Sequence, residues 1–158
     1  MGLDMYLNRK LFIGEQYDHR NVKAKLEITY KGLPIKIDDK ISEVVMEGVY
    51  WRKANAIHNW FVEKVQNGTD DCKPYEVSVE ELEALYRTVS DVLDHKGDED
   101  YAEEHLPTTS GFFFGSTNYG KWYWEDLEYT KERIKAELDW ANSQPDIFYP
   151  SWEYQSSW

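Results

Sequence analysis

The sequence predicts an α+β fold, in which an N-terminal antiparallel sheet is covered by about three helices as a single pair of layers. Strand-like patterns fill the first third of the chain and helical patterns follow, an order typical of α+β folds. A chain of 158 residues is long enough to bury one core. We therefore expect residues 1–158 to form one globular domain, with an aromatic tail at about 144–158 packed on it.

The first expected elements are strands. Residues 22–30 alternate apolar and polar side chains, which is the pattern of a half-buried strand. Lys31-Gly32 is a turn signal, and residues 33–37 are expected to return as a second strand. Residues 5–13 predict another strand, and the Ile and Val content of residues 41–49 favours a strand there too.

The first helix is expected from about Trp51 to Gln66. Helical spacing places Trp51, His58 and Phe61 on one stripe and Trp60 on the opposite side. A helix that is apolar on two sides lies between two layers or at an interface.

Two more helices are expected after it. One begins at Ser78, because Ser78 and Glu81 have the spacing of a capping box. The other spans about residues 122–142 and stops before Pro145, which cannot continue a helix. Between these helices, residues 112–114 are expected to form a short buried strand flanked by polar loops.

Composition limits the class of function. The net charge of −12, from 30 acidic and 18 basic residues, repels a phosphate backbone and argues against generic nucleic-acid binding. A single cysteine excludes an internal disulfide and suits a reducing cytosol. No apolar run approaches the roughly 20 residues that span a bilayer, so we expect a cytoplasmic protein that does not enter a membrane.

His58 on the first helix is the clearest candidate for a site. Asn55 lies three residues earlier, and residues three apart on a helix are neighbours, so the two side chains can hold one ligand. A hydrogen-bonded core histidine is the alternative, and the sequence leaves both open. The candidate ligand-binding residues are Trp51, Arg52, Asn55, His58, Ser110, Ser116 and Tyr119.

Residues 115–121 match the letters of a phosphate-binding loop, G-x-x-x-x-G-K. Trp122 stands where such a loop needs Ser or Thr to hold magnesium, which favours a chance match. The small residues and backbone donors of this segment still suit a pocket for an anion or a nucleotide-like ligand. The four histidines are scattered, so we expect neither a metal nor a cofactor.

Five blocks of the sequence carry a resemblance to other proteins. They are residues 1–7 (MGLDMYL), 50–61 (YWRKANAIHNWF), 70–72 (DDC), 110–116 (SGFFFGS) and 155–158 (QSSW). Together they resemble a family of small uncharacterised proteins from bacteriophages and bacterial genomes. The resemblance spans most of the chain and implies a protein of the host cytosol. It implies no activity, substrate or catalytic residue.

Three functions are compatible with the sequence. The first is a pocket around His58 that binds a small polar or nucleotide-like ligand. The second is a protein–protein interaction module, such as an inhibitor of a host factor, that uses Trp60, the aromatic tail and the acidic surface. The third is a hydrolase with His58 as general base, which requires a reactive group within hydrogen-bond reach. Enzymatic activity and oligomeric state stay open.

Overall fold

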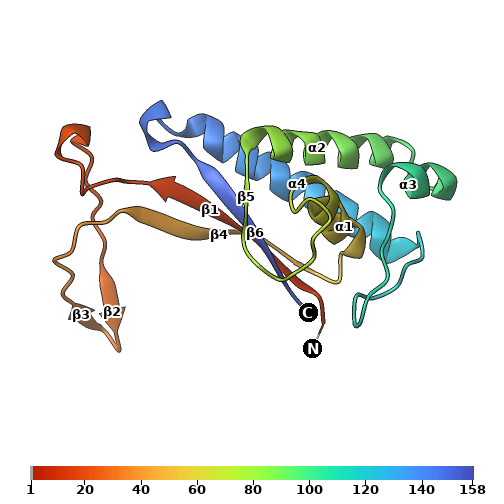
Figure 1. The fold of residues 1–158 in the computed structure, drawn as a ribbon, viewed down its shortest axis with the longest axis horizontal. Coiled ribbons are helices and arrows are strands. Elements are labelled where there is room, and N and C mark those ends of the chain that lie inside the picture. Colours follow the sequence, from red (N-terminus) through yellow and green to blue (C-terminus); the bar gives the residue numbers. More distant parts are fainter. Residues whose placement is uncertain (1) are drawn as a thin grey trace.

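A computed structural model describes residues 2–158 as a sheet with helices on one side and a projecting hairpin (Figure 1). The strands are β1 (Asp4–Phe12), β2 (Ile28–Tyr30), β3 (Leu33–Ile35), β4 (Glu43–Arg52), β5 (Tyr75–Val77) and β6 (Ser151–Ser157). The α-helices are α1 (Asn55–Lys64), α2 (Val79–Asp94), α3 (Glu99–His105) and α4 (Lys121–Ser143). Two short 3-10 helices, η1 (Asp18–Arg20) and η2 (Asp146–Phe148), complete the fold.

The main sheet has four antiparallel strands in the order β4-β1-β6-β5. Alternate residues of each strand point to opposite faces, and one face is buried. On the central strands, Met5 and Tyr154 are fully buried, whereas Tyr6 and Gln155 are exposed on the other face. Figure 1 shows the helices gathered on one side of this sheet. The predicted α+β fold is confirmed, with one more helix than expected.

Residues 22–40 form a projection that we call the arm. It consists of the hairpin β2–β3 and its flanks, and it extends away from the helices (Figure 1). The expected half-buried strand over residues 22–30 is wrong in two respects: only Ile28–Tyr30 pair, and these residues are exposed. The expected return strand is present as β3. The alternation in residues 22–30 therefore marks an amphipathic hairpin that no layer within residues 2–158 covers.

The start of the first helix was predicted too early. Trp51 belongs to β4, where it pairs with Met5, and α1 begins only at Asn55. The indole of Trp51 is buried and donates a hydrogen bond of 2.8 Å to the hydroxyl of Thr130. Trp60 is also buried, with 6% of its surface exposed, so α1 is enclosed on both sides.

Several elements after α1 differ from the sequence prediction. The aromatic tail is the central strand β6, in which Trp152, Tyr154 and Ser156 point inward with a period of two. The predicted strand at 112–114 is wrong, because this segment is a turn with Phe112 exposed. Strand β5 and helix α3 were also missed. Helices α2 and α4 are confirmed, and α2 has the expected capping box.

Candidate functional site

Two cavities lie on either side of the loop that joins α3 to α4. The larger, which we call the α1–α4 cavity, has a volume of about 530 Å³. It is lined by Arg52, Lys53, Ala54, Asn55, Ala56, Ile57, Thr108, Gly115, Ser116, Asn118, Gly120, Trp122, Tyr123, Asp126 and Leu127. The second, the His58 cavity, measures about 410 Å³. It is lined by His58, Asn59, Val62, Glu63, Asp70, Thr109, Ser110, Gly111, Phe112, Phe114 and Trp158.

Asn55 fixes the loop that separates these cavities. Its amide nitrogen donates to the carbonyl oxygens of Phe114 and Ser116, at 3.2 and 2.9 Å. Its amide oxygen accepts from the backbone N–H of Thr109, at 3.2 Å. Because the side chain is buried and these bonds engage both ends of its amide, Asn55 shapes the walls of both cavities.

His58 is the centre of a buried network between α1 and β6. Its Nδ1 lies 2.8 Å from the hydroxyl oxygen of Tyr154, and its Nε2 lies 2.9 Å from Oδ2 of Asp70. The other carboxylate oxygen of Asp70 accepts from the indole N–H of Trp158, at 3.0 Å. The imidazole edge also meets the ring of Phe114, with centroids 5.2 Å apart.

The chemistry of this network indicates where its protons lie. Burial raises the pKa of Tyr154 well above its usual value, so the phenol stays protonated and can donate to Nδ1. A neutral imidazole then carries its proton on Nε2 and donates to Asp70. Both ring nitrogens of His58 are therefore engaged within the protein, and neither has a lone pair directed at a substrate.

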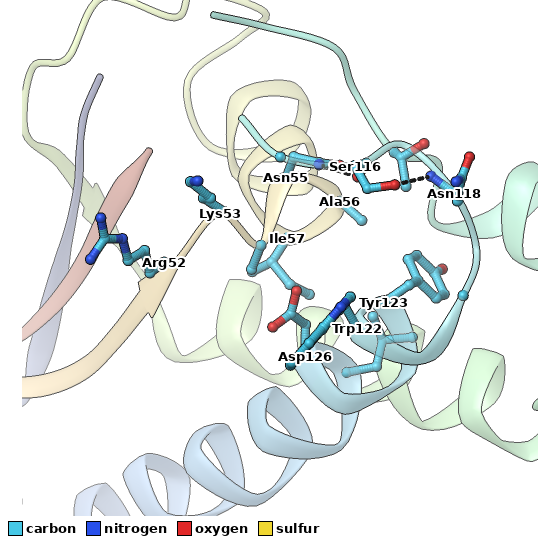
Figure 2. Close-up of a pocket in the computed structure, with 15 residues that line it drawn as sticks. Arg52, Lys53, Asn55, Ala56, Ile57, Ser116, Asn118, Trp122, Tyr123 and Asp126 are labelled. Carbon is cyan, nitrogen blue, oxygen red and sulfur yellow. Dashed lines mark hydrogen bonds between the residues drawn. The ribbon is translucent and has the colours of Figure 1, made fainter. Parts of the chain in front are cut away.

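The α1–α4 cavity is bordered by two helix N-termini, and Figure 2 shows them meeting around the open space. Neither helix has a side-chain cap. Within residues 2–158, the backbone N–H groups at the starts of the helices donate no hydrogen bond at Ala56, Ile57, Lys121, Trp122 and Tyr123. Such N–H groups and the positive ends of helix dipoles favour an acceptor or an anion.

Asp126 stands on the wall of the same cavity (Figure 2). Burial, and secondarily the nearby negative charge of Glu125, raise the pKa of its carboxyl from the usual 3.8 to about 6. In the described part of the chain, no hydrogen-bond donor or cation stabilises its charged form. A partly buried carboxyl with a perturbed pKa on the wall of a cavity is a candidate functional group.

Aromatic and basic side chains surround the mouth of the cavity. Trp122 is 73% exposed at the start of α4, where its indole is available for stacking. Arg52 ends β4 and Lys53 follows it, and Figure 2 shows their charged ends directed away from the enclosed space. They add positive potential at the mouth and do not occupy the cavity.

The residues predicted as one site are divided in the structure. Arg52, Asn55 and Ser116 line the α1–α4 cavity, and His58 and Ser110 line the other. Two lie elsewhere, since Trp51 is in the core and Tyr119 uses its hydroxyl to accept from the N–H of Thr108. The segment 115–121 follows a turn and not a strand, so it is not a phosphate-binding loop of the G-x-x-x-x-G-K type.

Asp126 was missed by the sequence prediction, although a signal was present. It lies three residues after Tyr123 and four before Thr130, two residues that helical spacing places on one face of the helix expected at 122–142 and that are buried in α4. An acidic residue on a buried stripe needs either a partner or a function.

Replacing Asp126 by asparagine is expected to stabilise the protein at pH 7.5 by about 1–2 kcal/mol. The raised pKa means that the folded state binds the carboxyl proton more tightly than the unfolded chain does. Protonation of Asp126 therefore makes its full contribution to the free energy of unfolding below about pH 4. This contribution is lost as the pH rises through about 6. The asparagine amide has no charge to desolvate, so the difference from the wild type should vanish at pH 4.

Urea unfolding at pH 4 and pH 7.5 measures this difference. Glu132→Gln is the matched control, because it removes an exposed carboxylate from the same helix. The interpretation fails if Asp126→Asn and Glu132→Gln change stability equally at pH 7.5.

Three negative findings bear on the identity of the site. Among residues 2–158, no three His, Cys, Asp or Glu side chains gather where they could hold a metal ion. In the same part of the chain, no helix is both long and apolar enough to cross a membrane. No protein-family model, curated protein or solved structure matches the chain.

Proposed function

We propose that this protein binds a small nucleotide-like ligand in the α1–α4 cavity. The observation that carries the proposal is the unpaired carboxyl of Asp126 on the wall of a cavity bordered by two uncapped helix N-termini. These groups make opposite demands: the carboxylate needs hydrogen-bond donors, and the backbone N–H groups need acceptors. A ligand with donors at one end and an anionic group at the other satisfies both.

A nucleoside monophosphate has this distribution of groups. Its ribose hydroxyls or base N–H groups can donate to Asp126, and its phosphate can accept from the N–H groups of α1 and α4. Trp122 offers a face for stacking a base, and Arg52 and Lys53 favour approach of an anion to the mouth. The cavity volume of about 530 Å³ lies within the range of small-molecule sites.

Thermal unfolding with a panel of ligands tests the proposal. The panel contains nucleosides, nucleoside mono- and triphosphates, and inorganic phosphate alone. A ligand present at 100 times its Kd adds about 2.7 kcal/mol to the free energy of unfolding, which raises Tm by roughly 5–10 °C in a chain of this size. We expect a nucleoside monophosphate to give this shift and phosphate alone to give little.

Variants locate the binding site. Asp126→Asn and Trp122→Ala should each weaken binding at least tenfold in calorimetry, whereas Glu125→Gln should not, because Glu125 is exposed and does not line the cavity. The affinity of the wild type should also fall below about pH 6, where Asp126 is protonated. The proposal is rejected if no member of the panel raises Tm, or if Asp126→Asn binds as tightly as the wild type.

Ser110→Trp separates the two cavities. This change fills the His58 cavity, which Ser110 lines, and leaves the α1–α4 cavity open. If Ser110→Trp abolishes binding while Asp126→Asn preserves it, the ligand occupies the His58 cavity instead.

A further inference from the structure

The arm carries an uncovered apolar face. In β2–β3, Ile28 is paired with Ile35 and Tyr30 with Leu33, so these four side chains share one face. Leu26 and Ile37 continue the alternation on either side. The apolar face comprises Leu26 (52% exposed), Ile28 (40%), Tyr30 (65%), Leu33 (71%), Ile35 (50%) and Ile37 (38%).

The opposite face of the arm is also exposed to solvent. Thr29 and Pro34 form the opposite face of the ladder, and the alternation continues on that side with Glu27 and Lys36. Every residue from 25 to 40 is exposed. An isolated two-stranded hairpin is only marginally stable in water, and packing of one face against another surface is what stabilises it. The arm has a formed hairpin but no such surface within residues 2–158.

The hairpin is held in a defined conformation. Lys31 and Gly32 at its tip have φ angles of 50° and 79°, as the tight type I′ turn of a two-residue hairpin requires. At its base, the carboxylate of Glu15 accepts from the backbone N–H groups of Ala24 and Ile41, at 2.5 and 2.9 Å. These two bonds lower the pKa of Glu15. The hairpin therefore projects from the body in a defined conformation (Figure 1), and its six apolar side chains are exposed.

We propose that two copies of this chain pair through the apolar faces of their arms. The six side chains together expose about as much surface as three fully exposed large residues, which is roughly 500–600 Å² per copy. Two such faces bury about 1,000–1,200 Å² in total, at the lower limit of a specific interface. No member of the face is charged, so two copies can meet without burying an unpaired charge.

The charge distribution is compatible with self-association through the arm and opposes direct contact between the bodies. The arm contains five lysines and three acidic residues, so the rest of the chain has 27 acidic residues against 13 basic ones. Two acidic bodies repel each other in direct contact. Pairing through the arms keeps the strongly acidic bodies apart, and the arms that then meet carry only a small net charge of +2 each.

The mass in solution as a function of concentration tests this proposal. Light scattering on the full chain should give 18.8 kDa when dilute and twice that mass when concentrated. Leu33→Glu and Ile35→Glu should each remain monomeric at least tenfold beyond the midpoint for the wild type. Thr29→Glu is the matched control, because it adds the same charge to the opposite face of the hairpin and should dimerise normally. Since all three positions are exposed, Tm should be unchanged in dilute solution.

Three results would overturn the proposal. One is a wild type that stays monomeric up to about 1 mM, the weak limit of specific association. Another is loss of the dimer in Thr29→Glu to the same extent as in Leu33→Glu. The third is sedimentation of the monomer with phosphatidylglycerol vesicles, lost in Leu33→Glu, at concentrations where no dimer forms; that result assigns the face to a lipid surface.

Discussion

Replacing His58 by alanine is expected to lower the free energy of unfolding by about 3–5 kcal/mol. The imidazole is fully buried, so its removal leaves a cavity between α1 and β6. It also leaves the buried hydroxyl of Tyr154 without its 2.8 Å partner and deprives Asp70 of its 2.9 Å contact. Urea unfolding followed by tryptophan fluorescence measures the change.

Two variants make this prediction specific. Asn59→Ala alters the next residue of α1, whose side chain makes only a 3.4 Å bond to the carbonyl of Pro107, and it should cost less than about 0.5 kcal/mol. Tyr154→Phe removes one hydroxyl and should cost about 1–2 kcal/mol. In the double variant with His58→Ala these costs should not add, because both changes break the same bond. A loss of under 1 kcal/mol for His58→Ala would show that the network does not hold β6 to α1.

This network changes the interpretation of His58 that the sequence suggested. A general base needs a nitrogen that can reach the substrate, and here both nitrogens are bonded to Tyr154 and Asp70. The sequence could identify the histidine as unusual on an apolar stripe. It could not supply Tyr154, because this residue lies 96 positions away and comes close to His58 through the pairing of β6 within the sheet.

Local sequence patterns predicted those elements that are determined by contacts between residues close to one another in the sequence. Helix α2 is an example, since the Ser78–Glu81 capping box involves residues three apart and marks the correct start. Trp51 shows the limit of such patterns. The same residues fit a helical stripe and a strand alternation, and only the ladder with β1 decides that Trp51 extends β4.

The candidate site was partly visible for the same reason. Asn55 was predicted as a ligand-binding residue beside His58, and the structure engages its amide with carbonyl and N–H groups 54–61 residues further along the chain. Its hydrogen bonds therefore go to the backbone of a loop and leave little for a ligand. The exposed arm shows a different limit of sequence patterns. Alternation in residues 22–30 predicted a strand with one face buried, yet no surface within residues 2–158 covers that face.

Replacing Arg9 by methionine is expected to lower the free energy of unfolding by about 3–5 kcal/mol, the cost of leaving a buried charge unpaired. Glu137 on α4 is fully buried, and Arg9 on β1 approaches both its oxygens, at 3.1 and 2.9 Å. The indole N–H of Trp152 donates to the same carboxylate, at 3.0 Å. Methionine is a long unbranched side chain that can fill similar space beside Trp140, over which the guanidinium lies, but it supplies no charge. Chemical denaturation of both proteins at neutral pH measures the loss.

The adjacent Lys10 provides the control for this pair. Its ion pairs with Glu43 and Glu153, at 3.2 and 3.4 Å, are partly exposed, so Lys10→Met should cost less than about 1 kcal/mol. If burial of the charge is the cause, the double variant Arg9→Met, Glu137→Met should be more stable than Arg9→Met alone, because no charge then remains buried. A double variant less stable than Arg9→Met would instead mean that the packing of Glu137 and its bond to Trp152 outweigh its charge. The pair also holds β1 against α4.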